Sequence, residues 1–135
     1  DYLFNSNNTK WFTDNYNSYL TDTFLSENNF DNIDNYTIEL YMGVKCHDSE
    51  REVPRLIKIL DEIKFSDNKL KIYLLKQNKT SNSEFEIGKN IINTPTIIFY
   101  KESLEINRIV EFPVETLERD IYKIINDIEY RHVYY

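Results

Sequence analysis

The chain has 135 residues, of which 41% are hydrophobic and 29% charged. This balance fits a single soluble globular domain and excludes a disordered or fibrous chain. The 16 basic and 23 acidic residues give a formal net charge of −7, so neither nucleic acids nor anionic membrane surfaces are expected partners. The longest apolar runs are too short to cross a bilayer.

The cysteine and histidine counts limit the chemistry of any site. The single cysteine, Cys46, excludes an internal disulfide framework, and two histidines, His47 and His132, leave little for a metal cage. Counting leaves a carboxylate-rich calcium or magnesium site open, but no D-x-D-x-D-G spacing appears, and we expect neither a metal nor another cofactor. No secretory signal pattern opens the sequence, so we expect a cytoplasmic location, although a removed leader stays open because the chain begins at Asp1.

The N-terminal region is polar and then aromatic. Residues 11–25 carry aromatic and apolar side chains at helical spacing, which predicts one amphipathic helix. Residues 28–35 have the composition of a loop. The predicted helix could pack across a sheet or provide a dimer face.

A strand and a long helix come next. Residues 36–44 alternate and are rich in β-formers, which predicts a strand. A helix is expected over residues 48–64, capped by Asp48 or Ser49 and kinked by Pro54. Its apolar residues form one stripe at helical spacing: Val53, Leu56, Ile57, Leu60 and Ile63.

The second half of the chain completes an α/β pattern. Strands are predicted at residues 70–75, 96–100 and 104–111, with a short helix near residues 85–90. The short connection between the last two strands predicts an antiparallel hairpin. A final helix is expected over residues 114–128. This order predicts a three-layer α/β sandwich with a mixed four-stranded sheet.

The cysteine lies where the first predicted strand gives way to the long helix. Free N–H groups and the positive dipole end of a helix stabilise a thiolate there, which lowers the pKa of the thiol. Lys45 and a protonated His47 would add to this effect, and Asp48 would oppose it. The position favours a reactive thiol at Cys46, and the alternative is a buried structural cysteine.

A second motif opens the strand at residues 96–100. Pro95 precedes it directly, and proline cannot donate a hydrogen bond to a sheet ladder. A cis Thr94–Pro95 peptide bond would explain the proline by turning the chain sharply beside Cys46.

Two segments carry a resemblance to a known family. They are Lys45-Cys-His-Asp-Ser-Glu-Arg-Glu-Val-Pro54 and Asn93-Thr-Pro-Thr-Ile-Ile-Phe-Tyr100, and the segment from Arg108 to Val114 also fits. The chain resembles the thioredoxin family over about residues 36–129. It is most similar to a bacterial thioredoxin-like group with a W-C-G-D-S segment.

The resemblance implies a thioredoxin-like fold in one domain spanning residues 1–135. The thioredoxin-like core would occupy residues 36–129, preceded by a helical extension over residues 1–35 and followed by a tail over residues 130–135. In this fold the residue before the cis-proline offers its backbone to an extended peptide. The resemblance therefore implies that Thr94 and Pro95 form a substrate platform.

The chain departs from the family at the residues that drive reduction. Serine, Ser49, occupies the position of the second cysteine, and Lys45 replaces the usual tryptophan. The buried acidic position of the family falls at Leu40, whereas the adjacent Glu39 would face the other side of the sheet. Ser49 cannot resolve a mixed disulfide because its hydroxyl is not a sulfur nucleophile.

The leading hypothesis is a monothiol protein that takes part in thiol–disulfide exchange. Cys46 would be the nucleophile, Ser49 its hydrogen-bonding neighbour, and Lys45 and His47 would flank the bound partner. Partners would be protein or small-molecule thiols and disulfides, and a homodimer through Cys46 stays open. Whether the protein is an enzyme stays open as well.

Two other hypotheses remain. The three departures favour a non-catalytic binding module that has kept the fold and lost redox activity. Binding of glutathione or an iron–sulfur cluster, as in monothiol glutaredoxins, is disfavoured because Asp48 would repel the carboxylates of glutathione.

Overall fold

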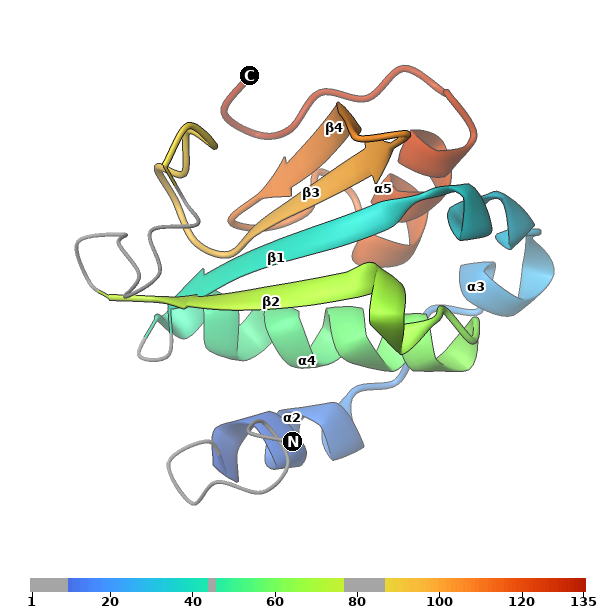
Figure 1. The fold of residues 1–135 in the computed structure, drawn as a ribbon. Helices are drawn as coiled ribbons and strands as arrows, with labels where there is room; N and C mark the ends of the chain where they lie inside the picture. Colours follow the sequence, from blue (N-terminus) through green and yellow to red (C-terminus); the bar gives the residue numbers. More distant parts are fainter. Residues whose placement is uncertain (1–9, 44–45, 77–86) are drawn as a thin grey trace.

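Four strands form one mixed sheet at the centre of the protein (Figure 1). The computed structural model describes residues 10–43, 46–76 and 87–135. The central strand β1 pairs in parallel with β2 and antiparallel with β3, and β4 pairs antiparallel with β3. The strands are β1 (Thr37–Gly43), β2 (Leu70–Leu75), β3 (Thr96–Lys101) and β4 (Leu104–Val110).

The sheet order is β2-β1-β3-β4, and the fold is thioredoxin-like, as the sequence predicts. The parallel β1–β2 pair is joined through the long helix α4 (His47–Glu62), as parallel pairing requires a crossover. The antiparallel β3–β4 pair is a hairpin whose two turn residues, Glu102 and Ser103, have φ values of 53° and 69°. Tight hairpin turns demand such left-handed residues, which are usually glycine, asparagine or aspartate. Here the hairpin forms without glycine.

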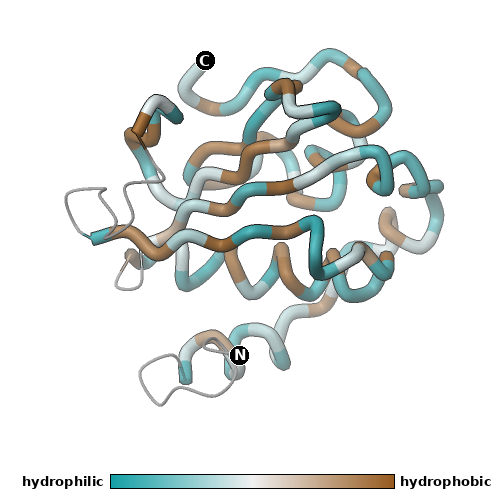
Figure 2. The backbone as a smooth tube through the Cα atoms, viewed as in Figure 1, coloured by the Kyte–Doolittle hydropathy of each residue, from teal (hydrophilic) through white to brown (hydrophobic). Residues whose placement is uncertain are grey.

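The main core lies between the sheet and two helices, α4 and α5 (Leu117–Ile125). Figure 2 shows hydrophobic residues recurring along the strands and helices that enclose it. Because strand side chains alternate between faces, every second residue of β1 enters this core: Ile38, Leu40 and Met42. The helical stripe predicted for α4 is buried against them, with Val53, Leu56, Ile57 and Leu60 in the core.

The N-terminal extension holds two helices rather than the single one predicted over residues 11–25. They are α2 (Lys10–Ser18) and α3 (Phe24–Glu27), and the 3₁₀ turn η2 (Asp31–Asn35) follows. The prediction of one helix is wrong because contacts from distant elements end α2. The Lys58 ammonium donates to the carbonyl oxygens of Tyr16 and Tyr19, and Glu118 accepts a hydrogen bond from the Asp22 N–H. Helix α2 packs against α4 and not across the sheet (Figure 1).

Helix α4 begins at His47, one residue earlier than the sequence predicts. Cys46 is the N-cap, and Ser49 lies inside the first turn, so the prediction of Asp48 or Ser49 as the cap is wrong. The Cys46 carbonyl accepts the Glu50 N–H at 2.9 Å, which starts the helix there. At the other end Lys64 has a φ of 59°, and the 3₁₀ turn η3 (Asp67–Lys69) leads into β2. The helical run continues through Pro54.

Helix α5 is shorter than the predicted 114–128. The Thr116 side chain accepts a hydrogen bond from the Arg119 N–H at 3.1 Å and caps the start. At the end Asp127 is left-handed, with a φ of 57°, and the Ile128 N–H donates to the Lys123 carbonyl. These contacts form a Schellman motif, which ends a helix. The prediction overran because hydrophobic spacing alone carries no information about this cap.

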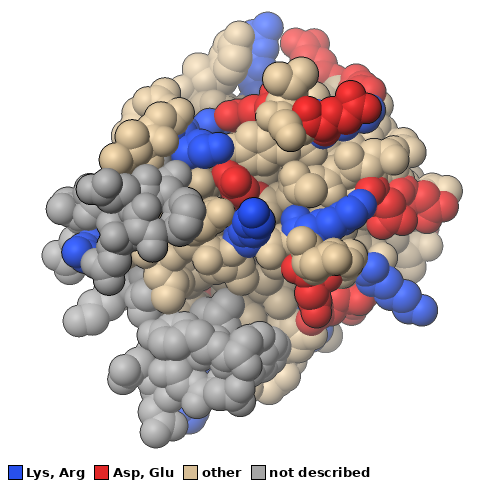
Figure 3. All heavy atoms as spheres, viewed as in Figure 1, with Lys and Arg blue, Asp and Glu red and all other residues tan. Residues whose placement is uncertain are grey.

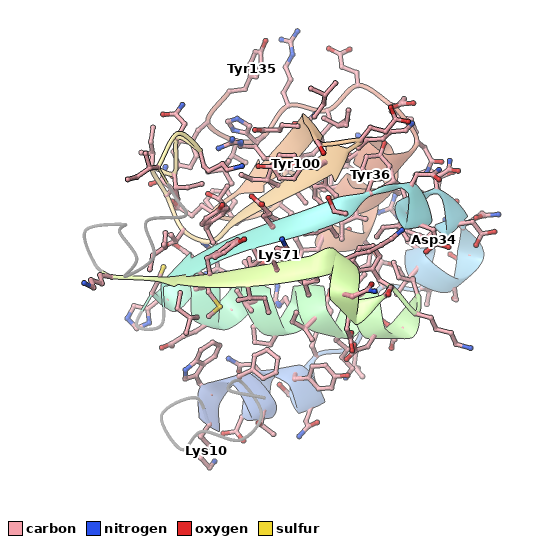
Figure 4. The ribbon with its side chains drawn as sticks, viewed as in Figure 1. Lys10, Asp34, Tyr36, Lys71, Tyr100 and Tyr135 are labelled. Carbon is pink, nitrogen blue, oxygen red and sulfur yellow. The ribbon has the colours of Figure 1, made fainter. Side chains whose placement is uncertain are left out.

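The opposite face of the sheet carries tyrosines. Tyr41 and Tyr73 stack with ring centroids 4.8 Å apart, and Tyr41 and Tyr100 donate hydrogen bonds to Glu39. Figure 4 shows Tyr100 on this face. The short helix predicted near residues 85–90 lies partly outside the described residues, and residues 87–89 form a turn around Gly88. Within the described part of the chain, α4 and α5 both lie on the face opposite these tyrosines.

Candidate functional site

The end of β1, the start of α4 and the loop before β3 meet at Cys46. The Cys46 sulfur lies 3.4 Å from both the carbonyl oxygen and the hydroxyl oxygen of Thr94. The Thr94–Pro95 peptide bond is cis, as expected from the sequence. The two motifs found 48 residues apart in the chain thus lie in direct contact. Cys46 as a residue is partly exposed.

Ser49 lies one helical turn after the cysteine. Its side chain is fully buried, and its hydroxyl oxygen accepts a hydrogen bond from the Gly43 N–H at 3.2 Å. The backbone N–H and the hydroxyl of Ser49 also interact with the Cys46 sulfur as hydrogen-bond donors, which lowers the pKa of the thiol. Ser49 therefore connects the end of β1 to the thiol, and it is not the helix cap that the sequence suggested.

Hydrogen bonds around the sulfur set the pKa of the Cys46 thiol. Burial is the largest single influence and raises this pKa, because it disfavours the charged thiolate. The Thr94 hydroxyl, the N–H and hydroxyl of Ser49, and the Asp48 N–H act in the opposite direction. Together they hold the pKa of Cys46 below its ordinary value. A lowered pKa increases the thiolate fraction near neutral pH, and the thiolate is the reactive form.

Gly43 is a residue of the site that the sequence analysis missed. A Cβ atom at this position would lie 3.1 Å from the Cβ of Cys46 and 3.5 Å from the hydroxyl oxygen of Thr94. The absent side chain thus lets the cysteine and the proline loop approach the end of β1. The sequence did contain a sign of this role. The chain has two glycines, and this one ends the predicted strand three residues before the cysteine.

The remaining predicted site residues lie at the edge of this arrangement or beyond it. His47 is the first residue of α4; its side chain is 98% exposed, with Nδ1 3.9 Å from a Glu50 carboxylate oxygen. Lys45 lies outside the described residues. Leu40 is fully buried in the core, and Glu39 points to the other face of the sheet, as predicted.

No cluster of three or more histidine, cysteine, aspartate or glutamate side chains suited to a metal ion occurs in the described ranges. Among the described helices, none combines the length and hydrophobicity needed to cross a membrane. Acidic and basic side chains are interspersed over the face shown in Figure 3.

The fold of the chain is thioredoxin-like, and its one cysteine lies at the start of α4. No protein-family model matches the sequence, and no curated protein matches it. Similar solved structures include a thioredoxin from Fasciola hepatica, with 15% identity, 73% of this chain and 86% of that chain covered, and a TM-score of 0.49. Thioredoxin f2 from Chlamydomonas reinhardtii is 17% identical; the match covers 57% of this chain and 67% of that chain, with a TM-score of 0.41. A malarial protein is 14% identical; the match covers 68% of this chain and 94% of that chain, with a TM-score of 0.48.

Proposed function

We propose that this protein is a monothiol thiol–disulfide exchange protein of the bacterial thioredoxin-like group, with Cys46 as its nucleophile. One observation carries the proposal: the sulfur of the partly exposed residue Cys46 lies 3.4 Å from the hydroxyl and carbonyl oxygens of Thr94, in surroundings that lower the pKa of the thiol. Protein and small-molecule disulfides are the proposed partners. A reducing compartment such as the cytoplasm would keep the lone thiol available.

The proposed reaction is a single exchange step. The Cys46 thiolate attacks one sulfur of a partner disulfide, a new sulfur–sulfur bond forms to Cys46, and the original bond breaks. The second partner sulfur leaves with the electron pair as a thiolate and takes a proton from solvent. Because Ser49 supplies no second thiol, an external thiol or the partner's own thiol must release the product. This chemistry suits isomerisation or thiol capture rather than net reduction.

The test compares the folded protein with a peptide of residues 42–50, which contains the same cysteine without the fold. Each reacts at pH 7 with a disulfide of mercaptoethanol and thionitrobenzoate, whose coloured leaving group reports the rate. About 1.4 kcal/mol of thiolate stabilisation raises the thiolate fraction about tenfold. Because the less basic thiolate is also a weaker nucleophile, about half of this effect is lost on a logarithmic scale, so we expect the folded protein to react about threefold faster or more. Intact mass then identifies the adduct on Cys46, and added thiol should remove it.

Two controls define the result. Cys46→Ser should release no thionitrobenzoate, which assigns the reaction to this sulfur. A folded protein that reacts no faster than the peptide would contradict an activated thiol.

A second candidate function is a binding module without redox activity. The fully buried Leu40, which stands at the acidic position of ordinary thioredoxins, favours it because no carboxylate can transfer protons there. In that case Cys46→Ala would retain every partner captured by the wild-type protein. Under the exchange function, the captured partners would be lost with the sulfur.

A further inference from the structure

Hydrogen bonds hold the end of α2 against α4. Near the start of α4, the Asn15 side chain donates to the Glu50 carbonyl at 2.9 Å. Further along α4, the Lys58 ammonium donates to the carbonyl oxygens of Tyr16 and Tyr19. The end of α2 and the residues that follow it therefore have a fixed position beside α4 (Figure 1).

A cleft of about 470 Å³ opens between this part of the N-terminal extension and the first half of α4. Its volume is in the range of sites that bind small molecules. The extension contributes Asn15, Ser18, Tyr19 and Leu20 to the lining, and α4 contributes His47, Glu50, Arg51 and Arg55.

Three of the α4 residues recur at every fourth position and so lie along one side of the helix: His47, Arg51 and Arg55. The Arg51 guanidinium already has carboxylate partners, because it donates to Asp48 at 2.7 Å and to the buried Glu52. Arg55, one turn further on, is the member of this row whose charge is not paired.

Arg55 differs in this respect from the other arginines of the chain. All five arginines lie in the described ranges, and four form ion pairs with carboxylates: Arg51 with Asp48 and Glu52, Arg108 with Glu105, Arg119 with Asp22, and Arg131 with Glu129. For Arg55, the described residues supply neither an ion pair nor a hydrogen-bond acceptor. Because the chain has 23 acidic residues against 16 basic ones, an arginine without a carboxylate partner favours a partner from outside the chain.

The described contact of Arg55 is with an aromatic ring. Its guanidinium carbon lies 5.1 Å from the centroid of the Tyr19 ring, and this cation–π contact attracts the charge. The ring face supplies no oxygen acceptor, so the five N–H donors of the guanidinium remain available to a ligand in the cleft. Packing on Tyr19 thus accounts for the position of Arg55 but not for its missing acceptors.

A ligand for Arg55 is an anion, and the surroundings limit its charge to one. A guanidinium binds a carboxylate through two parallel N–H···O hydrogen bonds. The Glu50 carboxylate also lines the cleft, and it would repel a second negative charge on the ligand, as would the net charge of −7. Leu20 is 87% exposed and offers hydrocarbon surface at the same cleft.

We propose that the cleft between the end of α2 and α4 binds a small monocarboxylate with an apolar portion. The two carboxylate oxygens accept hydrogen bonds from Arg55, and the apolar portion packs against Leu20. The site goes beyond the exchange function proposed above and does not depend on it, because no bond is made or broken and Cys46 takes no part.

The test uses three probes with similar hydrocarbon portions and different head groups: isocaproate, the neutral isocaproamide, and isopentyl phosphate. Each is titrated at pH 8, where the phosphate is a dianion, while NMR follows the Arg55 Nε–H signal and the Leu20 methyl signals. We expect isocaproate to shift both sets of signals saturably. Isocaproamide should bind about tenfold more weakly or worse, since it lacks the charge that strengthens hydrogen bonds to a guanidinium.

Two outcomes with these probes would overturn the proposal. If isocaproate produced no saturable shifts, the cleft would bind no monocarboxylate. If isocaproamide bound as tightly as isocaproate, Arg55 would not recognise the charge. Isopentyl phosphate should bind more weakly than isocaproate, and Glu50→Gln should remove this difference; tighter binding of the phosphate by the wild type would contradict a site for a single charge.

Arg55→Met removes the guanidinium and keeps a long side chain over Tyr19, so we expect isocaproate to bind about tenfold more weakly or worse. The matched control is Arg131→Met, because Arg131 also lies over a tyrosine ring, 4.7 Å from the centroid of Tyr135, and has Glu129 as its partner. This control changes the net charge equally and should keep the wild-type affinity. Unchanged binding in Arg55→Met, or equal weakening in both variants, would refute the role of Arg55.

Two further variants keep the test independent of folding and of the thiol. Leu20 is largely exposed, so Leu20→Ala should leave the fold intact and weaken isocaproate about threefold; wild-type affinity would contradict the apolar contact. None of the probes contains sulfur, and Cys46→Ser should bind isocaproate as the wild type does. Loss of binding in Cys46→Ser would contradict a separate site, whereas an unreactive Cys46 would leave the binding result unaffected.

Discussion

Replacing Ser49 by alanine tests how the fold activates the cysteine. Ser49 is fully buried; it accepts the Gly43 N–H at 3.2 Å and helps to lower the pKa of the Cys46 thiol. The substitution removes only the hydroxyl oxygen and leaves the helical backbone in place. Two losses follow: the Gly43 N–H loses its acceptor, and the thiolate loses a donor.

The magnitudes follow from the energies of these two hydrogen bonds. A hydrogen bond to a charged group contributes about 1.5–3 kcal/mol, so the thiolate fraction below the pKa should fall roughly 10- to 100-fold. A more basic thiolate is also more nucleophilic, so on a logarithmic scale the exchange rate falls by only about half as much as the thiolate fraction. We therefore expect exchange roughly 3- to 10-fold slower in Ser49→Ala. The unpaired Gly43 N–H should lower the free energy of unfolding by about 1–3 kcal/mol.

The assay is the rate of thionitrobenzoate release at a pH below the titration midpoint of the thiol, with urea unfolding in parallel. Ser26→Ala is the matched control, because Ser26 lies in α3 and its hydroxyl donates to the Thr23 carbonyl at an exposed position. This control should keep the wild-type rate. A Ser49→Ala protein that is less stable but reacts at the wild-type rate would refute the role of Ser49 in activation.

Three further predictions concern the site and its supports. Gly43→Ala places a Cβ atom 3.1 Å from the Cβ of Cys46. We expect slower exchange and a free energy of unfolding in urea that is lower by about 1–3 kcal/mol. A wild-type exchange rate together with wild-type stability would contradict the close approach. Glu118→Gln weakens the acceptor of the 2.6 Å hydrogen bond from the Tyr19 hydroxyl. We expect the free energy of unfolding in urea to fall by about 1–3 kcal/mol. An unchanged free energy of unfolding would show that this hydrogen bond does not stabilise the fold. Burial is the main cause that raises the pKa of Asp120 above 3.8, so the folded state binds its proton more tightly than the unfolded state. This contribution to stability is present at low pH and is lost as the pH rises through the raised pKa. The free energy of unfolding of the wild type, relative to that of Asp120→Asn, should therefore increase as the pH is lowered. A difference between the two proteins that does not change with pH would contradict the raised pKa.

Local sequence patterns were sufficient to predict the strands and the strand-to-helix site. Strand β2 has the predicted bounds, and the predicted stripe on α4 is buried in the core apart from Ile63, which packs against it. These features depend on the periodicity of apolar residues, which local sequence contains. The contact between Cys46 and Thr94 also follows from the order of the elements, once the fold is assigned.

Features that depend on distant contacts could not be predicted in this way. Lys58 lies 39 residues after the Tyr19 carbonyl to which it donates, and this contact ends α2 early. The role of Gly43 depends on the space left between β1 and the cysteine. The position of Tyr134 likewise depends on a hydrogen bond to Glu111, 23 residues away. None of these contacts leaves a periodic pattern in the sequence.

The most direct test of the central claim is the pH dependence of Cys46 alkylation in the folded protein. Rates with iodoacetamide, followed by mass spectrometry over a range of pH values, give the titration midpoint of this single thiol. The account predicts an inflection below about 8.5, the ordinary value for a free cysteine. An inflection at or above that value would contradict an activated thiol and leave the protein a scaffold for binding.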